Sequence, residues 1–350
     1  MPDIREYGYS LMTDKKSGPL AALLKFILWL CALIYEAAVK TLAAGYEKRF
    51  FIPYKADPKV ISIGNITVGG TGKTPASINI AKILESWGKK VSILIRGYGA
   101  DEYMMLQEEL RDCPILVGPD RIKNSKRAFY NFGIDTVILD DGFQHWKIER
   151  DLDIVLLDAT NPFGNYKLIP RGILREPITA LRRADLIIIT KVDSQSSLKK
   201  MDEVYNVIGA LKKTDCVLES VYKPADLYEI SKGQSMGLKC IDKKKICLLS
   251  SIGNPGYFKQ KIQQLGARIE LEFTFLDHYD YKREDLYKIE GECNFFGAEL
   301  IVVTKKDAVK IKRLSLANEL AVPILVFDIE FEVIKNRKIL DERLSGIYSS

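Results

Sequence analysis

From Val60 onward, short apolar runs alternate with segments whose apolar residues recur at helical spacing. The runs are VISI (60–63), VSILI (91–95), TVILD (136–140), DIVLLD (153–158) and LIIIT (186–190). Because they are nearly continuous rather than alternating, they predict strands of a parallel sheet that is covered on both faces. After the first run, apolar residues from Ile80 to Trp87 follow a helical period, and Gly88 marks the expected end of that helix. The pattern predicts an α/β fold.

A second series of apolar runs follows the polar and irregular stretch KPADLYEISKGQSMGLKCIDKKK (223–245). The runs ICLLSSI, LEFTFL, LIVVT and PILVFDIEF predict a second, smaller α/β domain. We therefore expect three parts: an N-terminal helical region at 1–45, a core domain at 46–225, and a smaller domain with its linker at 226–350.

The segment LAALLKFILWLCALIYEAAVKTLAA (20–44) predicts a helix with an almost wholly apolar surface. Its longest stretch without a charge, 26–35, is shorter than the ~20 apolar residues that a membrane span needs. At 100° per residue, Lys25, Glu36 and Lys40 fall within a wedge of roughly 60°. This pattern favours a helix that lies in a membrane interface, with a buried core helix as the alternative.

The composition narrows the class of protein only slightly. The 350 residues are 47% hydrophobic and 28% charged, as in an ordinary globular protein. The six cysteines include no C-x-x-C pair, which favours reduced thiols over a disulfide framework or a metal cluster. A net charge of +6 favours anionic partners without choosing among nucleic acid, phosphorylated ligands and acidic lipid headgroups.

The segment ISIGNITVGGTGKTP (61–75) contains the Gly-Lys-Thr that ends a phosphate-binding loop. We assign the nucleotide phosphates to Thr67, Gly69, Gly70, Thr71, Gly72, Lys73 and Thr74. In such a loop the backbone N–H groups and the lysine meet phosphate, and the hydroxyl of the last residue holds Mg²⁺. Thr67 stands where the usual G-x-x-x-x-G-K-[ST] pattern has its first glycine, and a glycine-rich turn without a ligand is the alternative.

The segment TVILDDGFQH (136–145) supplies two carboxylates directly after an apolar run, in the manner of a Walker B strand. Alone, Asp140 and Asp141 are equally explained by a helix cap or a solvated turn. In a parallel sheet, however, ligands gather at the carboxyl ends of the strands, where these residues and the phosphate loop both lie. We therefore predict that Thr74, Asp140 and Asp141 hold Mg²⁺.

Other residues with chemical capability are few. His145 and His278 are the two histidines of the chain, and a structural role is the alternative for each. The guanidinium groups of Arg121, Arg171 and Arg175 have the geometry to meet phosphate through two hydrogen bonds, although surface arginines are commoner.

Seven segments together resemble the signature segments of tetraacyldisaccharide 4'-kinases, the lipid A 4'-kinases of Gram-negative bacteria. They are GNITVGGTGKTP, RGYG, VGPDR, ILDDGFQH, GILREP, IGNP and VTKKDAVK, in the family's order over most of residues 60–310. A loop without its first glycine is a family trait, which accounts for Thr67. The chain departs from the family where Gly99 leads directly into ADEY, without the longer loop and its GDEP segment, and where Tyr279 replaces the second histidine of DHH.

The resemblance implies ATP-dependent phosphorylation of the 4'-hydroxyl of a tetraacylated glucosamine disaccharide 1-phosphate, which gives lipid IV-A. It implies ATP and Mg²⁺, a P-loop NTPase-like core with a mostly parallel sheet, and a smaller C-terminal α/β domain. It also implies that the N-terminal amphipathic helix meets the cytoplasmic face of the bacterial inner membrane as a peripheral or monotopic anchor. The expected partners are thus the acylated lipid and the membrane surface, and not nucleic acid.

The resemblance further implies the roles of individual residues. Asp101 is the expected base and His278 orients it, with domain closure bringing the two together from the core and the smaller domain. Lys73 and Arg121 are expected to take part in catalysis. Substrate binding is assigned to Asn65, Gln144, His145, Arg171, Arg175 and Glu176. Because the loop is shortened, Asp101 as the cap of a helix that starts at Glu102 is the alternative.

Two other functions stay open from the residues alone. TKVD (190–193) resembles a guanine-reading motif, which would suit a P-loop GTPase or a metallochaperone-like switch protein, or it is the polar end of a strand. A membrane-bound scaffold with a degenerate nucleotide site is the third possibility. Preference for ATP or GTP separates the lipid kinase from the GTPase or switch protein. Absence of turnover with any acceptor would favour the scaffold.

Overall fold

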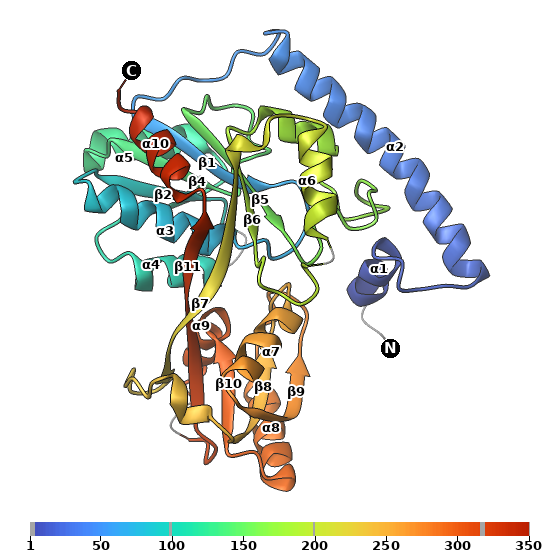
Figure 1. The fold of residues 1–350 in the computed structure, drawn as a ribbon, viewed down its shortest axis with the longest axis vertical. Helices are drawn as coiled ribbons and strands as arrows, with labels where there is room; N and C mark the ends of the chain where they lie inside the picture. Colours follow the sequence, from blue (N-terminus) through green and yellow to red (C-terminus); the bar gives the residue numbers. More distant parts are fainter. Residues whose placement is uncertain (1–3, 98–99, 199, 316–318, 350) are drawn as a thin grey trace. The chain divides into compact units, whose positions relative to one another are not determined.

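The computed structural model describes residues 4–97, 100–198, 200–315 and 319–349 and divides into two units (Figure 1). The first unit comprises Met1–Arg96, Asp112–Val221 and Val333–Ser350, and the second comprises Gly97–Arg111 and Tyr222–Glu332. Strands β7 (Val217–Glu229) and β11 (Ile324–Lys335) contribute residues to both.

The first unit is built on a parallel sheet with the strand order β3-β2-β4-β1-β5-β6-β7. Its other strands are β1 (Lys59–Asn65), β2 (Val91–Ile95), β3 (Ile115–Val117), β4 (Thr136–Asp140), β5 (Leu152–Asp158) and β6 (Leu186–Thr190). Its helices are α1 (Ile4–Met12), α2 (Pro19–Glu47), α3 (Lys73–Ser86), α5 (Arg121–Phe132), α6 (Met201–Gly209), α10 (Arg337–Gly346) and the 3-10 turns η1 (Ile178–Arg183) and η2 (Thr214–Cys216).

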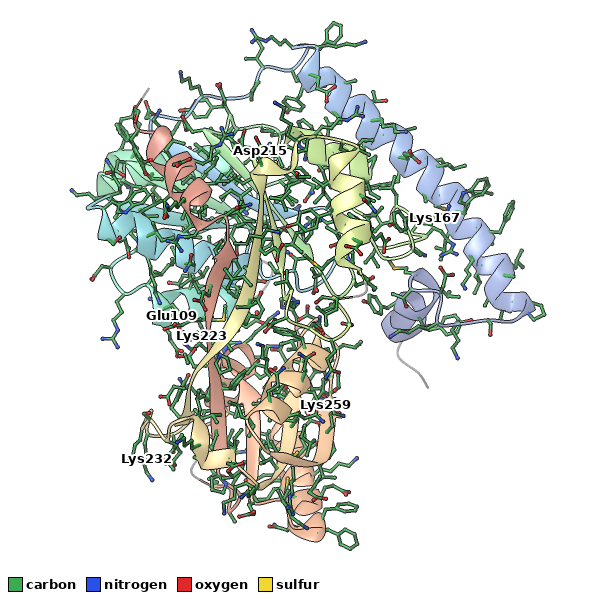
Figure 2. The ribbon with its side chains drawn as sticks, in the orientation of Figure 1. Glu109, Lys167, Asp215, Lys223, Lys232 and Lys259 are labelled. Atoms are coloured by element: carbon green, nitrogen blue, oxygen red, sulfur yellow. The ribbon has the colours of Figure 1, made fainter. Side chains whose placement is uncertain are left out.

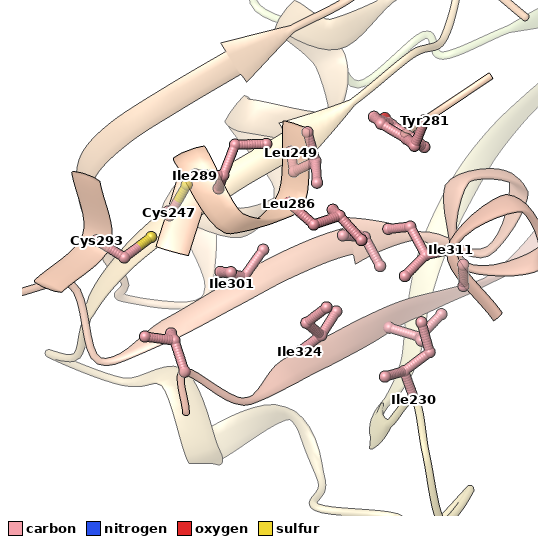
Figure 3. Close-up of a cluster of buried hydrophobic side chains, with 14 of the residues drawn as sticks. Ile230, Cys247, Leu249, Tyr281, Leu286, Ile289, Cys293, Ile301, Ile311 and Ile324 are labelled. Carbon is pink, nitrogen blue, oxygen red and sulfur yellow. The ribbon is translucent and has the colours of Figure 1, made fainter. Parts of the chain in front are cut away.

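The second unit has the strand order β11-β10-β8-β9, again with parallel pairs. Its other strands are β8 (Lys245–Ser250), β9 (Arg268–Thr274) and β10 (Leu300–Thr304). Its helices are α4 (Ala100–Glu109), α7 (Pro255–Gln264), α8 (Arg283–Phe296), α9 (Lys305–Lys312) and the 3-10 turn η3 (Leu238–Ile241). Figure 3 shows one of its cores, in which Leu286 and Ile289 of α8 lie beside Ile301 of β10 and Ile324 of β11.

The predicted mostly parallel α/β fold is confirmed, and the apolar runs explain why. Strands β2, β4, β5 and β6 are buried at every residue, because helices and loops cover both faces of the sheet. The polar stretch from Lys223 was expected to be irregular, but its first residues to Glu229 belong to β7. In that part of β7 only Leu227 is buried and Lys223 and Ala225 are exposed, so a strand with little burial accommodates its polar residues.

The two units divide the chain differently from the predicted ranges 46–225 and 226–350. The segment Gly97–Arg111 is assigned to the second unit, in which α4 packs on α9. The last residues return to the first unit, where the hydroxyls of Thr136 and Tyr348 lie 2.6 Å apart and Asn336 Nδ2 donates to Val217 O at 2.7 Å. Long-range packing, which no local pattern records, sets these boundaries.

Helix α2 extends over 29 residues and exposes most of its apolar side chains. Only Ala21 and Ala32 of α2 are buried, so the alternative of a buried core helix is wrong. Lys25 of the polar wedge pairs with Asp14, in the segment between α1 and α2, at 2.7 Å. By length and composition α2 is apolar enough to cross a membrane, despite the charges that make its uncharged stretch short.

Candidate functional site

The phosphate loop lies between β1 and α3 of the first unit. Helix α3 begins at Lys73, and Gly72 before it has a left-handed φ of 91°, which glycine adopts without a steric penalty. The N-terminus of α3 therefore presents backbone N–H groups to the loop, an arrangement that binds anions. Asn65, at the end of β1, donates from Nδ2 to Thr71 Oγ1 at 2.9 Å and thus fixes the loop from its other side.

Thr67 has a structural explanation. It lies opposite Leu174 in an antiparallel bridge, and the neighbouring Val68 N donates to Ile173 O at 2.7 Å. The backbone at Thr67 is thus extended, a conformation that suits a β-branched residue and requires no glycine. The bridge also brings the GILREP segment (172–177) beside the phosphate loop.

Asp140 lies at the end of β4, buried beside the first turns of α3. Its Oδ1 accepts a hydrogen bond from Ser77 at 3.1 Å and its Oδ2 one from Thr74 at 3.4 Å. Arg121, also buried, donates from Nη2 to the backbone oxygen of Asp140 at 2.9 Å, and burial lowers its pKa to about 10, which leaves the guanidinium charged at neutral pH.

The donor set around Asp140 fits Mg²⁺. The Thr74 hydroxyl and the Asp140 carboxylate are hard oxygen donors, the type that this ion prefers. Within the part of the chain that the structure describes, no cluster of three or more His, Cys, Asp and Glu side chains is arranged to hold a metal. Since Mg²⁺ usually needs one or two carboxylates together with substrate phosphates and water, this set suits an ion that binds with a nucleotide.

Asp141, the other predicted metal ligand, is held by two cations. Arg175 contacts both of its oxygens, Nη1 to Oδ1 at 2.6 Å and Nη2 to Oδ2 at 3.1 Å, and Lys73 Nζ lies 3.7 Å from Oδ1. Burial raises the pKa of Asp141, but Lys73 and Arg175 outweigh it, so the pKa lies below its usual value. Arg175 also donates to Asn65 Oδ1 at 3.1 Å, so the loop lysine, Asp141 and β1 are connected.

Further residues expected to bind substrate form one hydrogen-bonded chain. Gln144 Nε2 donates to Asn65 O at 2.9 Å and to Glu176 Oε1 at 3.0 Å. Glu176 is buried and receives both terminal nitrogens of Arg183, at 2.6 and 2.8 Å. Asn65, Gln144, Arg175 and Glu176 thus lie together next to the phosphate loop.

His145 lies in the turn after β4, which Arg150 holds through three backbone oxygens. Arg150 Nη2 donates to Gly142 O and Phe143 O at 3.2 Å and to His145 O at 2.8 Å. Within the described residues, the buried Nε2 of His145 makes no hydrogen bond. Burial and the neighbouring charges of Arg121 and Arg150 lower the pKa of His145 to about 4, so the ring is neutral at pH 7.

Arg171, expected to meet substrate, contacts the N-terminal segment instead. Its Nη2 and Nη1 donate to the two oxygens of Asp14 at 2.8 and 3.3 Å, and Asn165 donates to the same carboxylate at 2.8 Å. Burial raises the pKa of Asp14, but hydrogen bonds from Arg171, Asn165 and Lys25 lower it well below its usual range. Arg171 therefore fastens the segment that leads into α2.

The first two residues of TKVD, Thr190 and Lys191, donate hydrogen bonds to backbone oxygens of the phosphate loop. Thr190 Oγ1 donates to Thr71 O at 3.0 Å, and Lys191 Nζ donates to Gly70 O at 2.7 Å. Lys191 is buried and paired with the carboxylate of Asp158 at the end of β5. These contacts give Thr190 and Lys191 a structural role in the loop that requires no guanine.

Asp101 and His278 lie together in the second unit. Asp101 is in the first turn of α4, 5% exposed, and its Oδ2 lies 3.2 Å from His278 Nδ1. The expectation that the two residues come from different domains is wrong, because α4 packs on α9 within the second unit. Helix α4 begins at Ala100, one residue before Asp101, so Asp101 does not precede the helix as the cap alternative requires.

The sequence reasoning missed Ser77, Arg150, Arg183, Lys306 and Lys310. A signal existed for some of them. Ser77 follows Thr74 by three residues on α3, and Lys306 and Lys310 are four residues apart in the VTKKDAVK segment, so each pair shares a helix face. Nothing local marks Arg183, which reaches Glu176 only in the folded chain.

Comparison with known proteins gives consistent results. A family model for tetraacyldisaccharide-1-P 4'-kinases matches residues 24–348. The tetraacyldisaccharide 4'-kinase of Syntrophus aciditrophicus is 33% identical over 363 residues, covering 95% of this chain and 95% of that protein, and that of Bdellovibrio bacteriovorus is 32% identical, covering 81% and 88%. A crystal structure of LpxK from Aquifex aeolicus in complex with ATP has the same fold, with a TM-score of 0.70 at 24% identity over 93% of this chain and 99% of that one.

Proposed function

The chain belongs to the tetraacyldisaccharide-1-P 4'-kinase family, and we propose that it transfers the γ-phosphoryl group of ATP to the 4'-hydroxyl of an acylated glucosamine disaccharide 1-phosphate. The product is lipid IV-A. The observation that carries the proposal is the phosphate loop with Lys73 and Thr74 beside the buried carboxylate of Asp140.

In this proposal the first unit binds the nucleotide. The N–H groups of the loop and the N-terminus of α3 receive the phosphates, and Lys73 exchanges its contact with Asp141 for the β- and γ-phosphate oxygens. Thr74 and Asp140 would hold Mg²⁺, which would supply positive charge to neutralise the phosphoryl oxygens. Arg121 stays beside the backbone of Asp140 and adds positive charge to the same region.

Asp101 acts as the base in the second unit. The oxygen of the sugar hydroxyl forms a bond to the γ-phosphorus while the bond from that phosphorus to the bridging oxygen breaks. The bridging electron pair leaves with ADP, and the hydroxyl proton passes to the Asp101 carboxylate. His278, hydrogen-bonded to that carboxylate, orients it.

The residues next to the phosphate loop are proposed to bind the polar head of the lipid. Asn65, Gln144 and Glu176 offer hydrogen-bonding groups that suit a sugar, and Arg175 has the fork that suits a phosphate. His145 is neutral at pH 7 and adds a buried ring nitrogen. Arg171 joins this group only if it releases Asp14.

We further propose that α2 places the enzyme at the cytoplasmic face of the bacterial inner membrane. Its exposed large apolar side chains are Leu20, Leu23, Phe26, Ile27, Trp29, Leu30, Leu33, Ile34 and Leu42. Such a surface favours a lipid environment, and the acceptor is itself a lipid, so the anchor would concentrate enzyme where the substrate lies.

The test is transfer of ³²P from [γ-³²P]ATP to lipid A disaccharide 1-phosphate in mixed micelles. We expect labelled acceptor with ATP, much less with GTP, and none with lipid IV-A, whose 4'-position is already phosphorylated. The variant Asp140→Asn, in which transfer should be strongly reduced, serves as the control. Absence of transfer would overturn the proposed function, and equal or better use of GTP would favour the GTPase alternative.

A further inference from the structure

Helices α4 and α9 of the second unit meet through pairs of opposite charge. The carboxylates are Asp101, Glu108 and Glu109 on α4, and the ammonium groups are Lys305, Lys306, Lys310 and Lys312 on α9. Glu109, labelled in Figure 2, pairs with Lys305, and Glu108 pairs with Lys312 at 3.2 Å. Asp101 differs from the other two acids because it is buried and faces two lysines.

Three nitrogen atoms surround one oxygen of Asp101. His278 Nδ1 lies 3.2 Å, Lys310 Nζ 3.6 Å and Lys306 Nζ 3.9 Å from Oδ2. Among the described residues, the side-chain hydrogen bond of Asp101 is made by Oδ2 and none is made by Oδ1, so Oδ1 is available to accept a further hydrogen bond.

We propose that Lys306 and Lys310 are positioning residues of the kinase reaction, which hold the Asp101 carboxylate and the His278 ring so that Oδ1 is presented to the acceptor hydroxyl. The catalytic part of this inference rests on the proposed function. The arrangement of Lys306, Lys310 and His278 around Asp101 concerns the second unit alone, and it is tested without measuring phosphate transfer.

Lys310 fixes the carboxylate from the buried side. Its side chain is 3% exposed, and Nζ donates to Ser251 Oγ at 2.8 Å. Ser251 in turn donates to Asp307 Oδ1 at 2.5 Å, and Tyr281 donates to the same oxygen at 3.0 Å. A buried ammonium group requires such neutralising partners, so Lys310 is held between Asp101 and the Ser251–Asp307 pair.

Lys306 fixes the tautomer of the histidine from the other side. Its Nζ lies 3.3 Å from His278 Nε2 and 2.9 Å from Asp277 Oδ1. An ammonium group only donates hydrogen bonds, so Nε2 accepts and the neutral ring carries its proton on Nδ1. That proton points to Asp101 Oδ2, which keeps Oδ1 clear of the ring.

The charges around the pair determine how it titrates. The hydrogen bond to Asp101 raises the pKa of His278, against the effects of burial and of Lys306. Burial raises the pKa of Asp101, but His278, Lys306 and Lys310 together lower it well below its usual range. Other charged groups on the surrounding elements include Asp277 and Asp280 before α8, Lys305, Asp307 and Lys312 on α9, and Glu102, Glu108 and Glu109 on α4.

Nuclear magnetic resonance of ¹⁵N-histidine-labelled protein tests the geometry. The chain has two histidines, so the variant His278→Gln assigns the signals. For the unmodified protein we expect His278 to carry its neutral-form proton on Nδ1 and to have a raised pKa.

Two single variants on α9 remove one positive charge each. In Lys306→Met we expect the Nε2–H tautomer to appear and the pKa of His278 to rise by a few tenths of a unit, because a nearby cation is lost. In Lys312→Met, whose lysine pairs with Glu108, both properties should stay as they are. Unchanged signals in Lys306→Met, or equal changes in both variants, would overturn the inference.

Kinetics test the role of Lys310. We expect Lys310→Met to lower kcat roughly 10-fold with little change in the KM for ATP, the scale on which outer residues act through a reacting group. In the Asp101→Asn background the same substitution should cost less than about twofold, because residues that act as one unit are not additive. Lys310→Arg should keep most activity. Equal factors in the two backgrounds would make Lys310 merely structural.

The matched control for Lys310→Met is Lys261→Met. Lys261 is another buried lysine of the second unit, on α7, where its ammonium group lies over the ring of Tyr257. We expect near-parental kcat for this variant.

A second variant serves if Lys310→Met loses its fold. Ser251→Ala removes the hydroxyl to which the Lys310 ammonium group donates, and it should lower kcat by a smaller factor. That loss should also vanish in the Asp101→Asn background. If the unmodified chain transfers no phosphate, the proposed function fails, while the histidine spectra still decide the geometric inference.

Discussion

Two carboxylates, one in each unit, are held by different cations. Asp141 of the first unit has both oxygens bound by the guanidinium fork of Arg175. Asp101 of the second unit faces the point charges of Lys306 and Lys310 through one oxygen. Arginine matches both oxygens of a carboxylate, whereas an ammonium group orients only one. An available oxygen, rather than negative charge alone, therefore distinguishes the candidate base.

The two regions also differ in how the chain assembles them. In the first unit the polar residues follow strands β1 and β4, so their positions are set by parallel pairing of neighbouring strands. In the second unit Asp101 and His278 are 177 residues apart. They meet because α4 packs on α9, and Lys306 of α9 contacts His278 in the loop between β9 and α8. One site therefore depends on a sheet edge and the other on a helix–helix contact.

The largest effect is expected from the second unit. Asp101→Ala should lower kcat by roughly 10²- to 10⁴-fold, the range for loss of a general base. His278→Ala should lower kcat less, and the double variant should lose little beyond Asp101→Ala. Steady-state rates with the lipid acceptor measure this, with Asp280→Ala, an exposed carboxylate of the same loop, as control. Losses that multiply would separate the two residues.

A somewhat smaller effect is expected in the first unit. Lys73→Ala and Asp140→Ala should each lower kcat by about 10²- to 10³-fold. Each substitution removes a charged side chain that is positioned in advance to stabilise the phosphoryl group during transfer. Circular dichroism should show an intact fold. Lys82→Ala, on the exposed side of α3, is the matched control. Near-parental activity in Lys73→Ala would show that the nucleotide site has been assigned to the wrong residues.

Exchanging arginine and lysine tests whether the two carboxylates need different cationic groups. Arg175→Lys should lower kcat/KM about 10-fold, since one of two charge-assisted hydrogen bonds to Asp141 is lost. Lys306→Arg should change kcat/KM less than about threefold, because one oxygen of Asp101 is held in either case. The exposed Arg127→Lys on α5 is the control. Equal losses in the first two variants would contradict the comparison.

The smallest effect on turnover is expected at α2, which contributes no reacting group. Replacing Trp29, Leu30, Leu33 and Ile34 by serine should shift the protein toward the soluble fraction and raise the KM for micellar lipid, while kcat changes little. Substitution is a cleaner test than deletion of residues 1–44, because deletion also removes the contacts of Asp14 with Arg171 and of Tyr35 with the backbone of Arg175. Ile334→Ser, exposed on β11, is the control. Unchanged partitioning would mean that another surface is the anchor.

The sequence by itself determined the strands of the sheet, the phosphate loop and the family. Continuous apolar runs predict strands that are buried on both faces, and β2, β4 and β6 coincide with the runs at 91–95, 136–140 and 186–190. The loop and the first turn of α3 are contiguous in the chain, so the spacing of Gly72, Lys73 and Thr74 already specifies their geometry.

Which polar groups meet across the chain depends on how the elements pack. The tertiary structure placed Asp101 in the second unit, joined Arg171 to Asp14, and turned Lys191 to the phosphate loop. Each of these contacts depends on packing between elements that are far apart in sequence, for which residue type and local spacing carry no signal. Hydrophobic periodicity encodes which face of an element is buried, but the partner of a buried charge is selected only when the elements have packed.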